Sequence, residues 1–119
     1  MNKTTLTERQ LAIYAKWLHK VSDYISANMA NRNLTVGDIA NAVFMSERQF
    51  YRRIKKVTGL TPHQYLKKLR LEKAKSLLDS GAFSSVKEVA YAIGYSRSDY
   101  FSTLFESYYG DKPTSYFHI

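Results

Sequence analysis

The sequence contains no cysteine, and none of its apolar runs approaches the length of a membrane span. The lack of cysteine excludes disulfide bonds and cysteine-based zinc sites. The lack of a long apolar run argues against a transmembrane helix, and the first residues do not have the apolar segment of a secretion signal. The three histidines, His19, His63 and His118, stand far apart, so we expect no metal site and no cofactor. The composition predicts a cytoplasmic protein.

Acidic residues are outnumbered in this chain. There are 10 Asp and Glu against 18 Lys and Arg, which gives a net charge of +8 and a pI near 9.7. This balance favours an anionic partner, either nucleic acid or an anionic membrane surface, and a basic protein without such a partner is the alternative. Apolar residues make up 45% of the 119 residues, enough for the core of one compact domain or of two very small ones.

Two stretches of the chain repeat each other, "DIANAVFMSERQFYRRIKKVTGLTPHQYL" (38–66) and "EVAYAIGYSRSDYFSTLFESYYGDKPTSYF" (88–117). Ala40 and Ala42 align with Ala90 and Ala92 at an offset of 50. After one inserted residue the offset becomes 51, and the matched pairs are Phe50 and Phe101, Ile54 and Phe105, Gly59 and Gly110, Pro62 and Pro113, and Tyr65 and Tyr116. Two copies are too few for a solenoid, so the pattern predicts a duplicated supersecondary motif.

Pairs of residues at capping-box spacing mark the helix starts, and no stretch alternates in the way that is typical of strands. The pairs are Thr7–Gln10, Thr35–Asp38, Ser46–Gln49, Thr61–Gln64, Ser85–Glu88 and Ser96–Asp99. They predict an all-α chain of about seven helices, at roughly 7–30, 36–43, 46–57, 62–79, 86–93, 97–108 and 113–118. Each repeat then contains a short helix, a tight turn and a second helix. This is helix-turn-helix architecture, although many helical hairpins do not bind DNA.

The second helix of the first repeat has an apolar stripe around Phe50 and a basic face opposite to it. At 100° per residue, the outward positions carry three cations and a tyrosine and no acidic residue. Arginine bonds guanine bidentately, and lysine reaches phosphates. We therefore predict that bases are contacted by Arg48, Tyr51 and Arg52, and that phosphates are contacted by Ser46, Lys55 and Lys56.

The paired units and the stretch "HQYLKKLRLEKAKSLL" (63–78) resemble the DNA-binding domain of the AraC/XylS family of bacterial transcription regulators. The match runs from about Trp17 to Phe117, and the sequence of the first repeat is especially similar to the output domains of hybrid two-component regulators. The resemblance implies two helix-turn-helix units joined by a long connecting helix, and sequence-specific binding of double-stranded DNA. It places recognition helices 46–57 and 97–108 in successive major grooves. The positions of the second repeat that fit the family pattern are Ala90, Ala92, Gly94, Tyr95, Ser96, Tyr100, Phe101, Phe105, Gly110, Pro113 and Tyr116.

The chain departs from the family pattern at a few positions. Phe44 replaces the usual glycine of the first turn, where a bulky residue resists a left-handed backbone, so we expect this turn to be differently shaped or strained. Glu106 and Ser107 replace a basic pair, and Phe117 replaces a closing arginine. Residues 88–117 carry two cations and four acids, whereas residues 37–66 carry five cations and two acids.

The second recognition helix therefore presents a different face from the first. Its outward positions equivalent to those of the first helix are Asp99, Ser102, Thr103 and Glu106. Because a carboxylate can accept a hydrogen bond from cytosine, acids are compatible with base contacts. We predict a phosphate contact by Arg97 and base contacts by Ser98, Asp99, Ser102 and Thr103.

Four segments are expected: an N-terminal extension or connector (1–16), the first helix-turn-helix unit (17–60), the connecting helix (61–80) and the second unit (81–119). The connecting helix is rich in cations, and we expect most of them to be solvated, with one or two near phosphate. They are Lys67, Lys68, Arg70, Lys73 and Lys75.

Double-stranded DNA is the expected partner, and an upstream sensor or receiver domain outside this chain is a second one. The alternative function is a protein-interaction module, in which the acidic second unit docks on RNA polymerase or another regulator. The sequence has no nucleophile–base spacing, phosphate-cradling glycine loop or metal cluster, so an enzyme is not expected. A membrane partner is not expected either.

Overall fold

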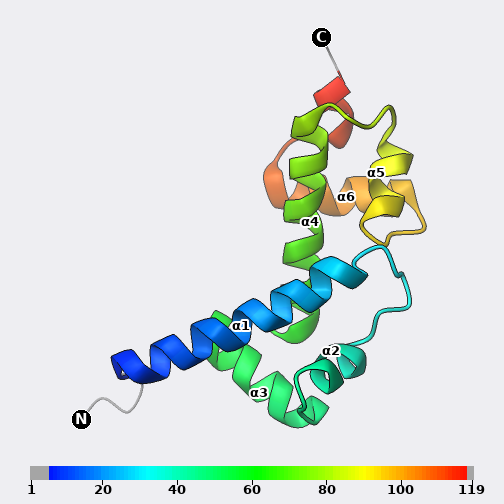
Figure 1. Ribbon diagram of the computed structural model, residues 1–119. Helices are drawn as coiled ribbons and strands as arrows, with labels where there is room; N and C mark the ends of the chain where they lie inside the picture. Colours follow the sequence, from blue (N-terminus) through cyan, green and yellow to red (C-terminus); the bar gives the residue numbers. More distant parts are fainter. Residues whose placement is uncertain (1–5, 118–119) are drawn as a thin grey trace.

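The computed structural model describes residues 6–117, which form six α-helices and a final 3-10 helix and contain no strand (Figure 1). The prediction of an all-α chain is therefore confirmed. The last predicted helix is a 3-10 helix rather than an α-helix, and position 118 lies outside the described residues. The elements are α1 (Glu8–Asn28), α2 (Val36–Ala42), α3 (Glu47–Thr58), α4 (Pro62–Ser80), α5 (Val86–Ala92), α6 (Ser98–Tyr109) and η1 (Pro113–Phe117).

Four of the predicted capping boxes are present, at Thr7, Thr35, Ser46 and Thr61. At the start of α3, the Gln49 N–H donates to Ser46 Oγ at 3.1 Å, and the Ser46 N–H donates to Gln49 Oε1 at 3.0 Å. These bonds satisfy N–H groups that the helix itself leaves without a partner. At α5 the Ser85 hydroxyl caps the helix, but the Glu88 carboxylate accepts from the Ser84 N–H instead of closing the box.

The capping box predicted at Ser96 and Asp99 is wrong. The residue inserted into the second repeat shifts the cap of α6 to Arg97, whose side chain makes no capping hydrogen bond. The guanidinium of Arg97 instead holds the Asp99 carboxylate, with Nη2 at 2.7 Å from Oδ2 and Nε at 3.2 Å from Oδ1. The predicted start of this helix at residue 97 is one residue early.

The core runs through both units and is built on equivalent aromatic residues. Phe50 on α3 and Phe101 on α6, which align in the internal repeat, are 1% and 0% exposed. Phe50 packs against Trp17 of α1 with ring centres 5.8 Å apart, and Phe101 packs against Phe105 at 5.7 Å. Helix α1 thus covers α3. It continues without a break across the expected segment boundary between residues 16 and 17.

Helix α4 connects the two units, and Figure 1 shows it rising from α1 and α3 toward α5 and α6. It packs against α1 and α3 in the first unit, and against α5, α6 and η1 in the second. Its apolar side chains Tyr65, Leu66, Leu71, Ala74 and Leu78 are buried. A helix that is packed on both units fixes where each recognition helix lies. No helix within residues 6–117 combines the length and the apolar character that a membrane crossing requires.

Arg70 of α4 is buried, so it is an exception to the expectation that most cations of this helix are solvated. Its Nη2 donates to the Asn31 carbonyl at 3.1 Å, and its guanidinium lies 5.6 Å from the centre of the Tyr95 ring. Burial lowers the pKa of Arg70. The side chain therefore ties the loop after α1 to the turn of the second unit.

The two turns have the same backbone shape. Phe44 has φ +60° and Gly94 has φ +91°, and both N–H groups donate to the carbonyl three residues before them, in Asn41 and Tyr91. The first turn is therefore not differently shaped. Phe44 takes a left-handed conformation that a bulky side chain resists. Of the two expected alternatives, a different shape or strain, the strained turn is the one observed.

Candidate nucleic-acid interface

Helix α3 presents the predicted base-contacting residues together on one exposed face. Because Phe50 and Ile54 are buried on the inner side, the outward positions are held in a fixed orientation. Arg48, Tyr51 and Arg52 are all exposed, and Tyr51 remains 49% exposed although it is a large aromatic residue. One carboxylate lies beside these residues: Glu47, at the start of the helix, is exposed and lines the same surface hollow as Arg48, Tyr51 and Arg52.

The predicted phosphate contacts lie at the two ends and along the flank of α3. Ser46 caps the N-terminus and is exposed. Lys55 is exposed near the C-terminus, where its Nζ donates to the Gly59 carbonyl at 3.3 Å. Lys56 is also exposed, with Nζ at 5.7 Å from the centre of the Tyr14 ring of α1. A cation at either edge of a helix is suited to one of the two DNA strands that border a groove.

Sequence reasoning assigned no role to Arg53, which lies at this flank beside two aromatic rings of α1. The Arg53 guanidinium carbon lies 5.4 Å from the ring centre of Tyr14 and 5.2 Å from that of Trp17. An arginine next to an aromatic face gains a cation–π interaction and a fixed direction. The position of Arg53 beside the apolar stripe was a signal, but nothing in the sequence showed that α1 would supply the aromatic rings.

Helix α6 holds the predicted contacts of the second unit, with a different set of partners. Asp99 and Thr103 are exposed, whereas Ser98 and Ser102 are half-buried. Asp99 is already paired with Arg97, and the hydrogen bonds from Arg97 hold the pKa of Asp99 below its usual value. The Thr103 hydroxyl donates to the Asp99 carbonyl at 3.1 Å. The structure thus brings the predicted acid and the predicted cation together.

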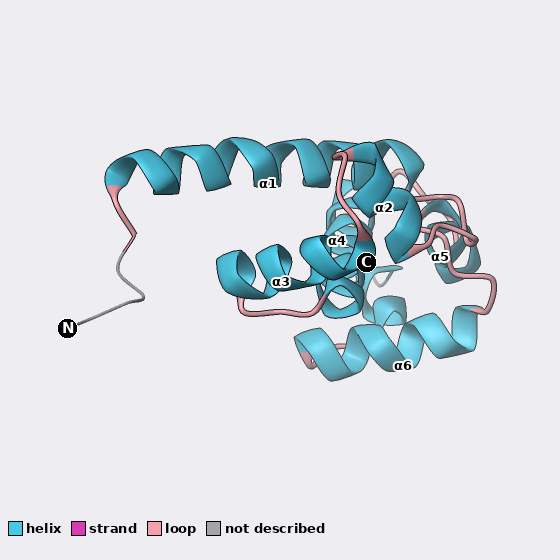
Figure 2. Ribbon diagram, turned by 90° about the horizontal axis from the view of Figure 1, so that it is seen from below, coloured by secondary structure: helices cyan, strands magenta, loops and turns pink. Residues whose placement is uncertain are grey.

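The two candidate recognition helices lie toward opposite ends of α4, α3 in the first unit and α6 in the second (Figure 1). In Figure 2, α1 runs along the opposite edge from α6, and α3 lies between them with a similar direction to α6. Each is the second helix of a helix-turn-helix unit, and each begins directly after the turn. This is the arrangement in which one protein can place two helices on one face of a duplex.

The comparison with known proteins agrees with this geometry. A family model described as "Helix-turn-helix domain" matches residues 39–118, about two thirds of the chain. A transcriptional regulator of Chromobacterium violaceum, described as containing an AraC-type DNA-binding domain, has a similar structure with a TM-score of 0.78. It is 28% identical, and the match covers 88% of this chain and 92% of the other. The chain belongs to the AraC-type helix-turn-helix family.

Two further relatives locate the AraC-type domain in larger proteins and on DNA. The transcriptional activator RhaS of Escherichia coli is 43% identical over 75 residues, 63% of this chain and 27% of RhaS. The DNA-binding domain of the transcriptional factor AdpA, solved in complex with a target DNA, has a TM-score of 0.74. It is 29% identical, covering 83% of this chain and 87% of that one. The chain spans well under half the length of the curated relatives that it matches.

Proposed function

We propose that this AraC-type domain binds double-stranded DNA sequence-specifically and regulates bacterial transcription, with α3 and α6 in successive major grooves. The observation that carries the proposal is the exposed face of α3, where Arg48, Tyr51 and Arg52 stand together and cations outnumber the neighbouring acid Glu47. Like charges gathered on one face repel each other unless an anionic partner neutralises them. The AdpA complex supports DNA as this partner. Two helices that enter one face of a duplex lie about 34–36 Å apart.

Within the first unit, Arg48, Tyr51 and Arg52 read base edges, and Ser46, Lys55 and Lys56 bind phosphates. An arginine on the outward face reaches O6 and N7 of guanine with two hydrogen bonds. Lys56 lies at the edge of the helix beside Tyr14, which favours the backbone over the groove floor.

Within the second unit, Ser98, Asp99, Ser102 and Thr103 are the candidates for base contacts, and Arg97 is the candidate for a phosphate. The ion pair between Arg97 and Asp99 is exposed on both sides, so opening it costs little. When the pair opens, the carboxylate is free to accept from cytosine N4 and the guanidinium is free to turn to the backbone.

A salt series tests the proposal. Neutralising four to six phosphates gives a log–log slope of affinity against salt of about −4 to −5 on a random duplex. Selection of bound sequences from a random duplex pool then identifies the operator. If the chain does not bind duplex at low salt, or binds with no slope, the proposal is wrong.

The roles within α3 are separated by two variants of equal charge change. Arg52→Ala is expected to cost about 1–3 kcal/mol on the selected site and to relax one position of it. Lys56→Ala is expected to lower the affinity for all DNA sequences to a similar degree. We would measure affinity for the selected site and for a set of single-base variants. Equal relaxation by both changes would contradict the assignment.

A second candidate function is a protein-interaction module, in which the acidic second unit docks on RNA polymerase or another regulator. The observation that favours it is the exposed Glu106 on α6, where α3 has the exposed cation Lys55. Charge reversal at Arg48 and Arg52 distinguishes the two functions. Loss of duplex binding with retained binding to purified polymerase supports docking in addition to DNA binding.

The domain is proposed to work beside an upstream sensor or receiver domain. The relatives that it matches are regulators rather than enzymes, and the matched part is only 27% of RhaS. Joining a sensor to a rigid two-unit reader would let a signal control access to the operator.

A further inference from the structure

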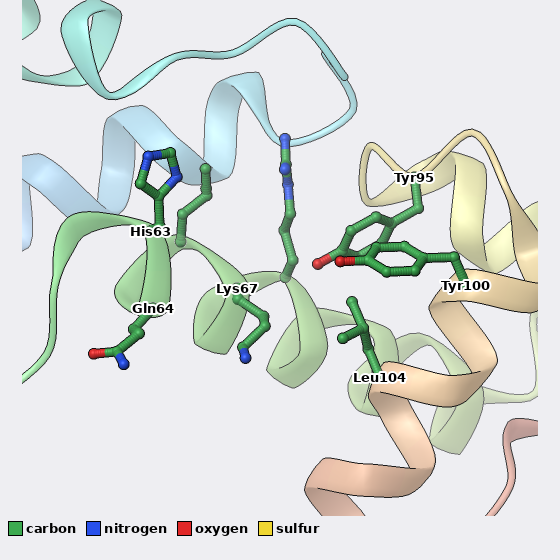
Figure 3. A pocket seen from close by; sticks show the side chains of 8 residues that line it. His63, Gln64, Lys67, Tyr95, Tyr100 and Leu104 are labelled. Atoms are coloured by element: carbon green, nitrogen blue, oxygen red, sulfur yellow. The ribbon is translucent and has the colours of Figure 1, made fainter.

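The recognition helix of the second unit has few cations of its own, yet the hollow beside it is rich in hydrogen-bond donors. Along α6 there is no lysine or arginine, and the nearest one, Arg97, is held by Asp99. A hollow of about 280 Å³ lies between α6 and α4 (Figure 3). Lys67, Arg70, Tyr95 and Tyr100 line it, and none of the described residues that line it is an aspartate or a glutamate.

The first unit has an equivalent hollow of about 260 Å³ between α3 and α1. Under the repeat, three of its lining residues correspond to lining residues of the second hollow. These pairs are Met45 and Tyr95, Gln49 and Tyr100, and Arg53 and Leu104. Because these matched residues lie in the turn and on the recognition helix of each unit, the two hollows occupy corresponding positions beside α3 and α6.

The two hollows obtain charge from opposite sides. In the first, the cations Arg52, Arg53 and Lys56 come from the recognition helix α3, and the aromatic Tyr14 comes from α1. In the second, the cations come from α4, and the aromatic residues come from the recognition helix α6 and the turn before it. The charge that α6 lacks is therefore supplied by α4 at the equivalent place.

The donors of the second hollow suit a phosphate group. Figure 3 shows the Tyr95 and Tyr100 rings side by side with their hydroxyl groups directed toward α4, and Lys67 leaving α4 between Gln64 and Leu104 in this view. The two ring centres are 6.0 Å apart. Lys67 is exposed and forms no ion pair with any of the residues 6–117. An ammonium group and two hydroxyls match the acceptor oxygens of a phosphodiester.

Arg70 acts behind these groups rather than in contact with the ligand. Its guanidinium is buried against the Tyr95 ring and bonded to the Asn31 carbonyl. It adds positive charge below the hollow and fixes the ring of Tyr95. Burial also raises the pKa of Tyr95, and its hydroxyl, like that of any tyrosine at neutral pH, is protonated and able to donate.

We infer that the hollow between α4 and α6 is a binding site for one backbone phosphate of the DNA, held by Lys67 and the hydroxyls of Tyr95 and Tyr100. The inference rests on the proposed function and assigns to the connecting helix the phosphate contact that the recognition helix of the second unit cannot make. The connecting helix is then part of the DNA-binding surface and not only a spacer.

The experiment combines variants of the full chain with duplexes that carry one uncharged methylphosphonate linkage at successive positions of the selected site. Lys67→Gln is expected to weaken binding about three- to tenfold, and to make the salt slope shallower by about 0.9. At one linkage of the second half-site, methylphosphonate is expected to lower the affinity of the unaltered chain by a similar factor. The same substitution is expected to cause no further loss of affinity in the Lys67→Gln variant. Tyr100→Phe, which keeps the ring, is expected to lower the affinity at least twofold. Its effect is expected to be non-additive with that of methylphosphonate at the same linkage.

Lys73→Gln is the matched control, because it makes the same charge change on the same helix beside a different hollow. It is expected to leave the salt slope unchanged and to be additive with every linkage. If Lys67→Gln behaves like Lys73→Gln, or is additive with every methylphosphonate, the phosphate site is wrong while DNA binding stands. If the unaltered chain does not bind duplex with a salt slope, the proposed function fails as well.

Discussion

The two helix-turn-helix units share most of their backbone, apart from one residue inserted before α6, and differ in almost all of their outward residues. Their turns make the same hydrogen bonds, from Met45 and Tyr95 to the carbonyls of Ala40 and Ala90 at 3.0 and 2.9 Å. Their recognition helices are both 12 residues long and both end in a left-handed glycine. The comparison shows that inward-facing residues and caps determine this scaffold, whereas the outward residues vary independently of it.

The turns themselves differ in their surroundings. A Cβ atom on Gly94 would lie 2.4 Å from the Met29 carbonyl oxygen and 2.8 Å from Arg70 Nη2. In the first unit, the side chain of Phe44 is 95% exposed at the equivalent position. Two constraints therefore require glycine at position 94 of the second turn: the left-handed backbone angle and the close packing around it. In the first turn only the backbone angle favours it.

Loss of the equivalent core aromatic residues is the largest effect that we expect. Phe50→Ala and Phe101→Ala are each expected to lower the free energy of unfolding by about 3–5 kcal/mol, because each leaves a cavity around a fully buried position. Chemical denaturation of both variants measures this. The scaffolds would not be equivalent if one variant lost less than about 1 kcal/mol. A variant that stays fully stable and no longer binds DNA would show that the phenylalanine is a contact residue.

Substitution in the second turn is expected to have the next largest effect. Gly94→Ala is expected to cost about 2–4 kcal/mol, because a left-handed alanine is strained and its methyl group would meet the Met29 carbonyl. The matched control is Gly110→Ala, where φ is +83° and no atom lies within 4 Å of the added methyl group. It is expected to cost only about 1 kcal/mol. Equal losses for the two variants in chemical denaturation would show that packing does not distinguish this turn.

The asymmetry of the recognition helices predicts a smaller effect on binding. Glu106 of α6 is exposed at the position equivalent to Lys55 of α3. Glu106→Lys is expected to tighten binding to selected and random duplexes alike, and to steepen the salt slope by about one unit. Affinities over a salt series measure both changes. Weaker binding to both duplexes by a folded variant would mean that Glu106 makes a required contact, and the second unit would then bind through its acids.

The sequence was sufficient to predict most of the scaffold and the face of α3. Caps, helix periodicity and the internal repeat are local or pairwise signals, and they located the helices to within about two residues. The sequence could not show which charged side chains would be buried or paired. Arg70 became internal because a carbonyl of the loop after α1 and the ring of Tyr95 lie within its reach. Arg97 and Asp99 became partners because one inserted residue displaced the helix cap.

Replacing the strained phenylalanine is expected to have the smallest effect and an opposite sign. Phe44 takes a left-handed backbone, which costs an L residue about 1–2 kcal/mol, and glycine removes that cost while losing about 0.5–1 kcal/mol through the greater freedom of the unfolded chain. Because the ring is almost fully exposed, its removal gives up little burial. Phe44→Gly is therefore expected to raise the free energy of unfolding by about 0.5–1 kcal/mol.

Phe44→Ala separates backbone strain from any contribution of the ring. It removes the ring and retains a Cβ atom in the left-handed conformation, so stability is expected to stay within about 0.5 kcal/mol of the unaltered chain. Both variants would be measured by chemical denaturation beside Gly94→Ala, since the two turns then receive opposite changes at one equivalent position. If both Phe44 variants destabilise the protein, the ring makes contacts that hold the first turn. The claim that the first turn is open while the second turn is packed would then be wrong.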